Sequence, residues 1–100
     1  MDYKVVLTSR AERDLFAAVT FLAEKNPAAA QRAGNSLLDA AESLRLLPFR
    51  GPMMKHRTDL RKLSHPPYYL IVYRVNESAR LVEIIRFWDA RRNPGQLHLP

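Results

Sequence analysis

The spacing of apolar residues changes once along the chain, near Gly51, and this change limits the folds that the sequence can adopt. Before it, apolar residues recur three and four positions apart, which is the period of an amphipathic helix. After it, short runs rich in β-branched and aromatic residues indicate strands. A chain of 100 residues has room for one domain. We therefore predict a single domain over residues 1–100, with its helices before most of its sheet.

Two helices are predicted in the first half, after a short strand at Tyr3–Leu7. Ser9 and Glu12 form a Ser-x-x-Glu capping box, which marks a helix start. Asn26-Pro27 marks the second start, because asparagine is a good N-cap and proline fits the first helical position. The second helix is predicted to stop at Leu47-Pro48. The link between the helices is short, so we expect antiparallel neighbours that pack through their apolar stripes.

The second half predicts about three strands. Leu60–Leu63 is a short one, and Tyr68–Val75 and Leu81–Trp88 form a hairpin around a polar turn. The segment 64–67 is expected to be a loop or an edge because its prolines cannot donate to a ladder. The tail from about residue 93 has little left to bury and is expected to be loose. The predicted class is α+β, a helical hairpin on one face of a mainly antiparallel sheet.

The net charge is confined to one half of the sequence. Residues 1–49 contain six Lys or Arg and six Asp or Glu residues, whereas residues 50–100 contain ten basic and four acidic ones. The whole net charge of +6 therefore belongs to the second half. A one-sided basic field attracts phosphate backbones or acidic protein surfaces, and charge alone does not separate the two.

Most enzyme signatures are missing from the sequence. It has no cysteine, no Gly-rich phosphate loop and no His-Glu-x-x-His or Gly-x-Ser-x-Gly motif. His56, His65 and His98 are far apart, so we expect no metal site and no cofactor. No apolar run reaches the length of a membrane span, and the first residues are unlike a signal peptide. We expect a soluble, cytoplasmic protein.

A basic and aromatic cluster on the predicted sheet is the candidate binding site. Its members lie on the strand around Leu60 and at the end of the last strand: Arg57, Arg61, Lys62, Arg86, Trp88, Arg91 and Arg92. Alternation would place Arg86 and Trp88 on one side of the last strand, with Ile85 and Phe87 on the other. Such groups can hold a phosphate backbone and stack a base, or hold an acidic peptide. Trp88 is equally consistent with a core position, and Glu83 and Asp89 are expected to pair with nearby arginines.

The C-terminal hairpin resembles that of toxins of the RelE/ParE superfamily, especially its ParE branch. Members commonly read Tyr-x-Ile-x-Tyr-Arg-Val and then Ile-x-Arg-Val-Leu-His-Gly-x-Arg-Asp. The matching segments are Tyr69-Leu70-Ile71-Val72-Tyr73-Arg74-Val75 and Ile84-Ile85-Arg86-Phe87-Trp88-Asp89-Ala90-Arg91-Arg92-Asn93. The resemblance extends over about residues 3 to 94. It departs at Asp89, where members often carry histidine, and at Trp88, where they carry a smaller aliphatic residue.

The resemblance implies the toxin of a type II toxin–antitoxin, or plasmid stabilisation, system. ParE-like toxins poison DNA gyrase without hydrolysing anything, which implies no catalytic residue. Arg86, Arg91 and Arg92 match the basic C-terminal motif of these toxins and are the candidates for target contact, and Arg61 and Trp88 join them from the basic and aromatic cluster. RelE-like toxins are instead ribosome-dependent messenger RNA endoribonucleases. In them an arginine commonly stands where this chain has Leu70, and a C-terminal tyrosine is usual, yet no tyrosine follows Tyr73 here. Gyrase inhibition is thus the leading hypothesis and RNA cleavage the alternative.

A third reading is a degenerate family member that is retained only as a binding partner. The resemblance also implies a cognate antitoxin whose acidic tail folds on binding to the toxin. The excess of positive charge and the exposed edges expected of a small sheet suit such a partner.

Overall fold

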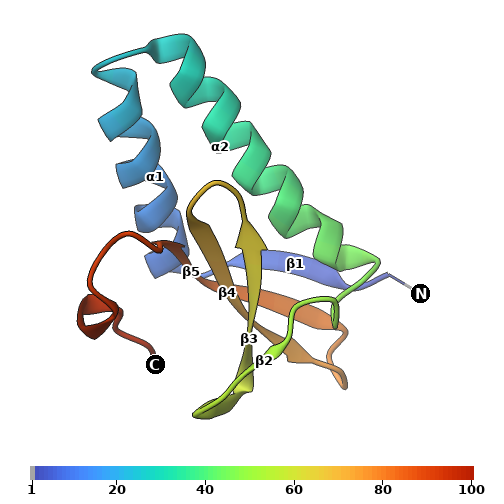
Figure 1. Cartoon of the computed structure of the whole chain (residues 1–100). Helices are drawn as coiled ribbons and strands as arrows, with labels where there is room; N and C mark the ends of the chain where they lie inside the picture. The colour runs from blue at the N-terminus through green and yellow to red at the C-terminus, as the bar shows by residue number, and fades with distance from the viewer. Residues whose placement is uncertain (1) are drawn as a thin grey trace.

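The computed structural model describes residues 2–100. Its elements follow the predicted order of strand, two helices and antiparallel strands (Figure 1). They are β1 (Lys4–Leu7), α1 (Ser9–Ala23), α2 (Pro27–Glu42), the 3-10 turn η1 (Ser43–Arg45), β2 (Met53–Met54), β3 (Arg57–His65), β4 (Tyr69–Asn76), β5 (Leu81–Asp89) and the 3-10 turn η2 (Pro94–Gln96). The helical hairpin lies on one face of the sheet, and its tip projects beyond the sheet in Figure 1.

The sheet has five strands in the order β1-β5-β4-β3-β2. β1 runs parallel to β5, and the other neighbours are antiparallel. The helical hairpin follows β1 in the sequence, and the strand that pairs with β1 is β5, the last strand of the chain. Four strands follow the helices, one more than predicted, because β2 has only two residues. A strand of this length shows no periodicity in the sequence.

The two helices begin with side-chain caps. The hydroxyl of Thr8 accepts a hydrogen bond from the Ala11 amide at 3.2 Å and donates to the Ile84 carbonyl at 2.8 Å. The N-cap is therefore Thr8, one residue before the predicted Ser9, and it also joins α1 to β5. Asn26 caps α2 as predicted, because its side chain accepts from the Ala29 amide at 3.1 Å.

The apolar side chains form a cluster on each face of the sheet. The larger one lies between the sheet and the helices and includes Tyr3, Ala11, Leu37, Ala41, Leu44, Leu63, Ile71, Tyr73, Val82, Ile84 and Phe87. The smaller one, on the other face, contains Leu60, Val72 and Ile85, with Met54 and Leu99 packed against it. Gly34 permits close contact of the helices, because a Cβ there would lie 2.9 Å from the Val19 side chain.

A β-bulge in β5 changes which face its residues occupy. Tyr73 pairs with Ile84 while its neighbour Val72 pairs with Arg86, so Ile85 is an extra residue. Ile85 consequently belongs to the smaller cluster and Phe87 to the larger one. The predicted simple alternation, with Ile85 and Phe87 on the same side, is therefore wrong.

The C-terminal segment returns to the sheet (Figure 1). Leu99 packs against the smaller cluster, and the His98 carbonyl accepts a hydrogen bond from Arg86 at 3.0 Å. The tail that was predicted to be loose thus covers part of the face opposite the helices. Within residues 2–100, neither helix is long and apolar enough to cross a membrane.

Candidate functional site

The turn that follows β5 holds an arginine in a fixed position on the surface. The Arg91 guanidinium donates to both carboxylate oxygens of Asp89, at 3.0 and 2.7 Å, and the Arg91 amide donates to the same carboxylate at 2.9 Å. The guanidinium also lies 3.7 Å from the centre of the Tyr68 ring. Hydrogen bonds from Arg91 hold the pKa of Asp89 below its ordinary value, so this carboxylate is ionised at neutral pH. The predicted pairing of Asp89 with an arginine is confirmed.

Arg92 lies beside the aromatic ring of the preceding strand. Its guanidinium is 4.7 Å from the Trp88 ring, and that of Arg86 is 5.3 Å from the same ring. Trp88 itself is buried, with 2% of its surface exposed. The buried Trp88 ring therefore packs beneath the Arg92 guanidinium. The burial of Trp88 does not fit the prediction that this ring contacts a target directly.

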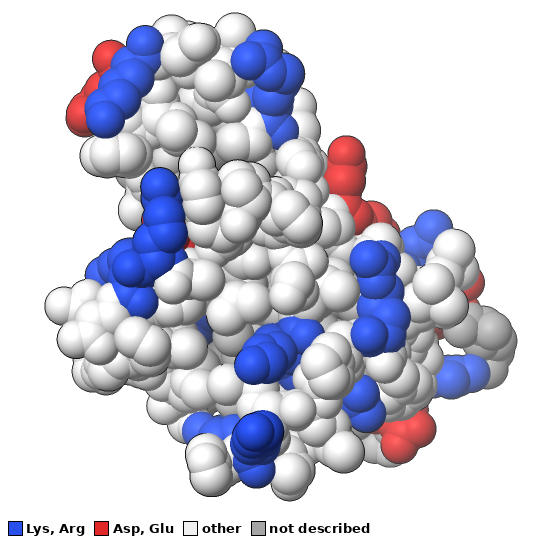
Figure 2. Space-filling model, in the orientation of Figure 1, with Lys and Arg blue, Asp and Glu red and all other residues white. Residues whose placement is uncertain are grey.

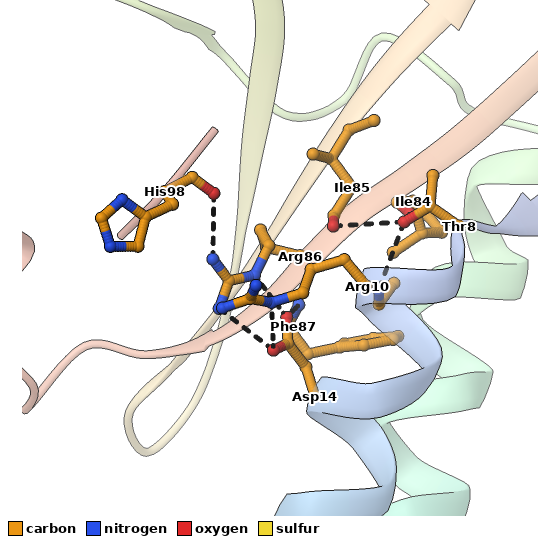
Figure 3. Close-up of polar contacts among 9 residues, drawn as sticks. Thr8, Arg10, Asp14, Ile84, Ile85, Arg86, Phe87 and His98 are labelled. Carbon is orange, nitrogen blue, oxygen red and sulfur yellow. Dashed lines mark hydrogen bonds and ion pairs between the residues drawn. The ribbon is translucent and has the colours of Figure 1, made fainter. Parts of the chain in front are cut away.

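Arg86 is also inside the molecule, paired with Asp14 of α1, which was not among the predicted site residues (Figure 3). Its guanidinium donates to the two carboxylate oxygens of Asp14, at 2.6 and 3.0 Å. The Phe87 amide donates to the same carboxylate at 3.1 Å. This pair ties α1 to β5. Arg86 is thus 2% exposed and bound to Asp14 and to the His98 carbonyl, which does not favour the predicted target contact; that contact stays a prediction.

Arg61 lies away from the other predicted site residues. Its side chain donates to the Gly51 carbonyl at 2.8 Å and lies 5.0 Å from the Phe49 ring. Arg61 pairs with Tyr73 on β4, whereas Asp89 pairs with Tyr69. Four residues along a strand correspond to about 13 Å. The structure therefore brings Arg91 and Arg92 together and leaves Arg61 apart on β3, with its side chain against the turn before β2.

A groove of about 550 Å³ runs between α1 and the end of the sheet where Arg91 and Arg92 lie. Its lining combines cationic, aromatic and small apolar side chains, and we call it the α1 groove. The residues are Asp14, Ala17, Ala18, Phe21, Leu22, Lys25, Tyr68, Tyr69, Phe87, Asp89, Arg91 and Arg92. Phe21 is 58% exposed, and the Lys25 amine lies 4.7 Å from its ring.

The helix side of this groove was not predicted from the sequence. Phe21 and Lys25 are one turn apart on α1, outside the apolar stripe that packs on the sheet. An exposed phenylalanine on the polar side of the helix, Phe21, could have indicated a binding surface there, but only the apolar stripe was considered.

Surface charges are spread in separate groups over the face seen in Figure 2, and acidic groups are fewer there than basic ones.

Tyr69 and Asp89, two titratable groups of the α1 groove, are poorly matched to proton transfer at neutral pH. Burial raises the pKa of Tyr69, with a further contribution from the Asp89 charge, so its phenol remains protonated. Asp89 has a lowered pKa and its oxygens already accept from Arg91. Efficient general acids and bases have pKa values near the working pH. The arrangement is suited to binding an anionic or aromatic surface. Among the described residues, no cluster of three or more His, Cys, Asp or Glu side chains is placed to hold a metal ion.

Comparison with known proteins shows the family to which this chain belongs. Residues 5–94 match the family model described as the ParE toxin of the type II toxin–antitoxin system parDE. Two curated relatives come from Caulobacter vibrioides. The chain is 35% identical to "Toxin RelE1" in an alignment of 91 residues that covers 88% of this chain and 94% of the relative. It is 39% identical to "Toxin RelE2" over 89 residues, which are 89% of this chain and 97% of the relative.

Two solved structures share the fold. One is the chromosomal ParDE toxin–antitoxin system from P. aeruginosa, with a TM-score of 0.74, 18% identity, and coverage of 87% of this chain and 95% of that one. The other is the toxin–antitoxin complex RelBE2 from Mycobacterium tuberculosis, with a TM-score of 0.67, 22% identity, and coverage of 89% and 99%. At these identities the likeness concerns the fold.

Proposed function

Because the chain belongs to the ParE toxin family of type II toxin–antitoxin systems, we propose that it arrests growth by binding DNA gyrase and is neutralised by a cognate antitoxin. It is a toxin of the ParE/RelE superfamily, whose two branches differ in target. The ParE family match supports the gyrase branch, whereas the names of the curated relatives belong to the other. The choice between targets must therefore come from the site.

The observation that carries the proposal is the chemistry of the α1 groove. It offers Lys25, Arg91 and Arg92 beside aromatic rings, and its Tyr69 and Asp89 have pKa values displaced away from neutrality. A toxin that binds its target needs charge and apolar surface, whereas one that cleaves RNA needs groups that transfer protons and stabilise a pentacoordinate phosphate.

The alternative is RNA cleavage on the ribosome, which the names of the two curated relatives favour. The side chains that RNA cleavage would need are either absent or already bound to other residues. Leu70 on β4 pairs with Trp88 and provides no charge, and Arg86 is occupied by Asp14. Cleavage would depend on Arg91, which would have to leave Asp89 to neutralise a phosphate. A degenerate, non-toxic family member is the third possibility.

We propose that the antitoxin covers the exposed apolar side chains of the helical hairpin. Phe16 and Phe21 on α1 are 73% and 58% exposed, and Leu38 on α2 is 40% exposed. Burying such side chains stabilises a complex by about 1.5–3 kcal/mol each when burial is complete. An acidic, fold-on-binding tail would add attraction to a chain of net charge +6.

The proposal is tested with purified protein in two parallel assays. We expect the chain to inhibit supercoiling by gyrase and to leave ribosome-bound messenger RNA intact. The double variant R91Q/R92Q should lose most of the inhibition. Arg32→Gln is the matched control, because Arg32 is exposed on α2 and outside the α1 groove. Cleavage of ribosome-bound RNA with unchanged supercoiling would reject the gyrase proposal.

A further inference from the structure

A second cavity, of about 390 Å³, lies on the other side of the Asp14–Arg86 ion pair. It is bordered by the start of α1, the middle of β4 and β5, and the C-terminal segment. We call it the arginine cavity, and its lining residues are Thr8, Arg10, Arg13, Arg74, Ile85, Arg86, His98, Leu99 and Pro100. It shares no lining residue with the α1 groove. Arg86 lines the arginine cavity, and its partner Asp14 lines the α1 groove.

The lining of the arginine cavity has an excess of positive charge. It contains four arginines and no Asp or Glu side chain. Arg13 is exposed and has no salt bridge among residues 2–100. Arg10 is only loosely paired, with its Nε 3.7 Å from Asp14 (Figure 3). Arg74 contacts Glu83 through Nε at 3.4 Å, which leaves its two terminal amines for another acceptor.

The rest of the lining is apolar. Ile85 and Leu99 belong to the smaller apolar cluster and form one wall, with Pro100 beside them. Arg86, although it borders the cavity, is already bound to Asp14 and to the His98 carbonyl. The cavity therefore combines three available guanidinium groups with an apolar wall.

We propose that the arginine cavity binds a nucleotide. Its phosphate would lie among Arg10, Arg13 and Arg74, and its base or sugar against Ile85 and Leu99. Planar guanidinium groups donate in pairs to phosphate oxygens, and arginine is favoured where such recognition occurs. The nucleotide is either free or one unit of a single-stranded nucleic acid, because both present the same phosphate and base.

Size favours a nucleotide over an acidic peptide side chain. Pockets for small ligands have volumes of about 300–1,000 Å³, and this cavity lies within that range. A single carboxylate would occupy a small part of it and leave the apolar wall uncovered. The inference does not depend on the cellular target of the toxin.

Binding is measured by NMR titration of the full-length chain with AMP, and with single-stranded DNA and RNA tetranucleotides that carry a 5′-phosphate. We expect shifts at Arg13, Arg74 and Leu99. The double variant R10Q/R13Q should weaken binding about 10-fold, because two of the three guanidinium groups around the phosphate lose their charge. The dependence of log K on log salt for the tetranucleotide should fall by about 1.4 for two lost contacts. Arg32→Gln should bind as the parent chain does.

The outcomes separate the sources of the ligand and the sites. Binding of AMP itself supports a free nucleotide, and binding of the tetranucleotides alone supports a nucleic-acid strand. The proposal is overturned if neither probe binds at millimolar concentration. It is also overturned if binding survives in R10Q/R13Q and is lost in R91Q/R92Q, which would assign it to the α1 groove. Thermal unfolding of each variant, followed by circular dichroism, verifies that it is folded.

Discussion

Arg86 and Arg91 are five positions apart in the sequence and have opposite environments. Arg86 is 2% exposed and bound to Asp14, whereas Arg91 is exposed and held by Asp89 above the Tyr68 ring. The same side chain thus joins two elements in one place and presents a charge to solvent in the other. The difference follows from their partners: Asp14 lies on α1, far from the hairpin motif, whereas Asp89 lies within the motif, two residues before Arg91.

Removing the charge of Arg86 should destabilise the fold. In Arg86→Met the Asp14 carboxylate loses its partner while remaining largely buried, with 12% of its side chain exposed. Breaking a buried pair in this way costs about 3–5 kcal/mol. Urea unfolding measures the change, and D14N/R86M should recover part of it because no unpaired charge remains. Arg32→Met should shift the unfolding free energy by less than about 0.5 kcal/mol. Equal stability of R86M and R32M would contradict the structural role.

The Asp89–Arg91 pair predicts a pH dependence with a defined sign. Because the pKa of Asp89 is lowered in the folded chain, its contribution to stability is present above the unfolded value, about 3.9. The contribution is lost as the pH falls through the lower, folded value. NMR titration of the Asp89 carboxyl carbon between about pH 6 and 2 should show a higher pKa in Arg91→Gln.

The matched control uses the other surface pair of this kind. Arg57 lowers the pKa of Asp59 through a side-chain hydrogen bond. Arg57→Gln should therefore raise the pKa of Asp59 and leave that of Asp89 unchanged. An Asp89 that titrates identically in R91Q and the parent chain would show that Arg91 is not its partner in solution.

At the scale of elements, periodicity predicted the helices, the hairpin and their order, because these depend on local patterns. It failed where one residue changes the register. The extra residue Ile85 moves Phe87 to the helix face, and no local pattern marks the bulge. The buried pair of Asp14 and Arg86 was missed for a similar reason, since its members are 72 positions apart. Arg91 and Arg92 were found because they follow a strand end directly.

The exposed phenylalanines of α1 support a prediction about the antitoxin. F16A/F21A should weaken antitoxin binding at least about 10-fold, through the loss of two apolar contacts. Because both rings are largely exposed, the stability of the free toxin should change by less than about 0.5 kcal/mol for each. Isothermal titration with the purified antitoxin measures the binding. Phe49→Ala, which removes an exposed ring outside both helices, is the control, and equal losses in both variants would reject the assignment.

At the scale of the whole molecule, one ion pair separates two different surfaces. The α1 groove lies on one side of Asp14–Arg86 and the arginine cavity on the other. Both surfaces contain cationic side chains that are available to a ligand. A chain of net charge +6 whose longest dimension is 42 Å can therefore offer two separate binding regions. The C-terminal segment helps to form the second region, although composition alone predicted that it would be loose.

The central claim is that the toxin acts by binding gyrase, and induced expression in a bacterial host tests it most directly. Cell shape, a DNA-damage reporter and the rate of protein synthesis are followed together, with R91Q/R92Q and R32Q expressed to equal levels. We predict that the parent chain and R32Q cause filamentation and switch on the damage response before translation falls, and that R91Q/R92Q does not. Translation that collapses first, with the reporter silent, would contradict the claim and identify the ribosome as the target.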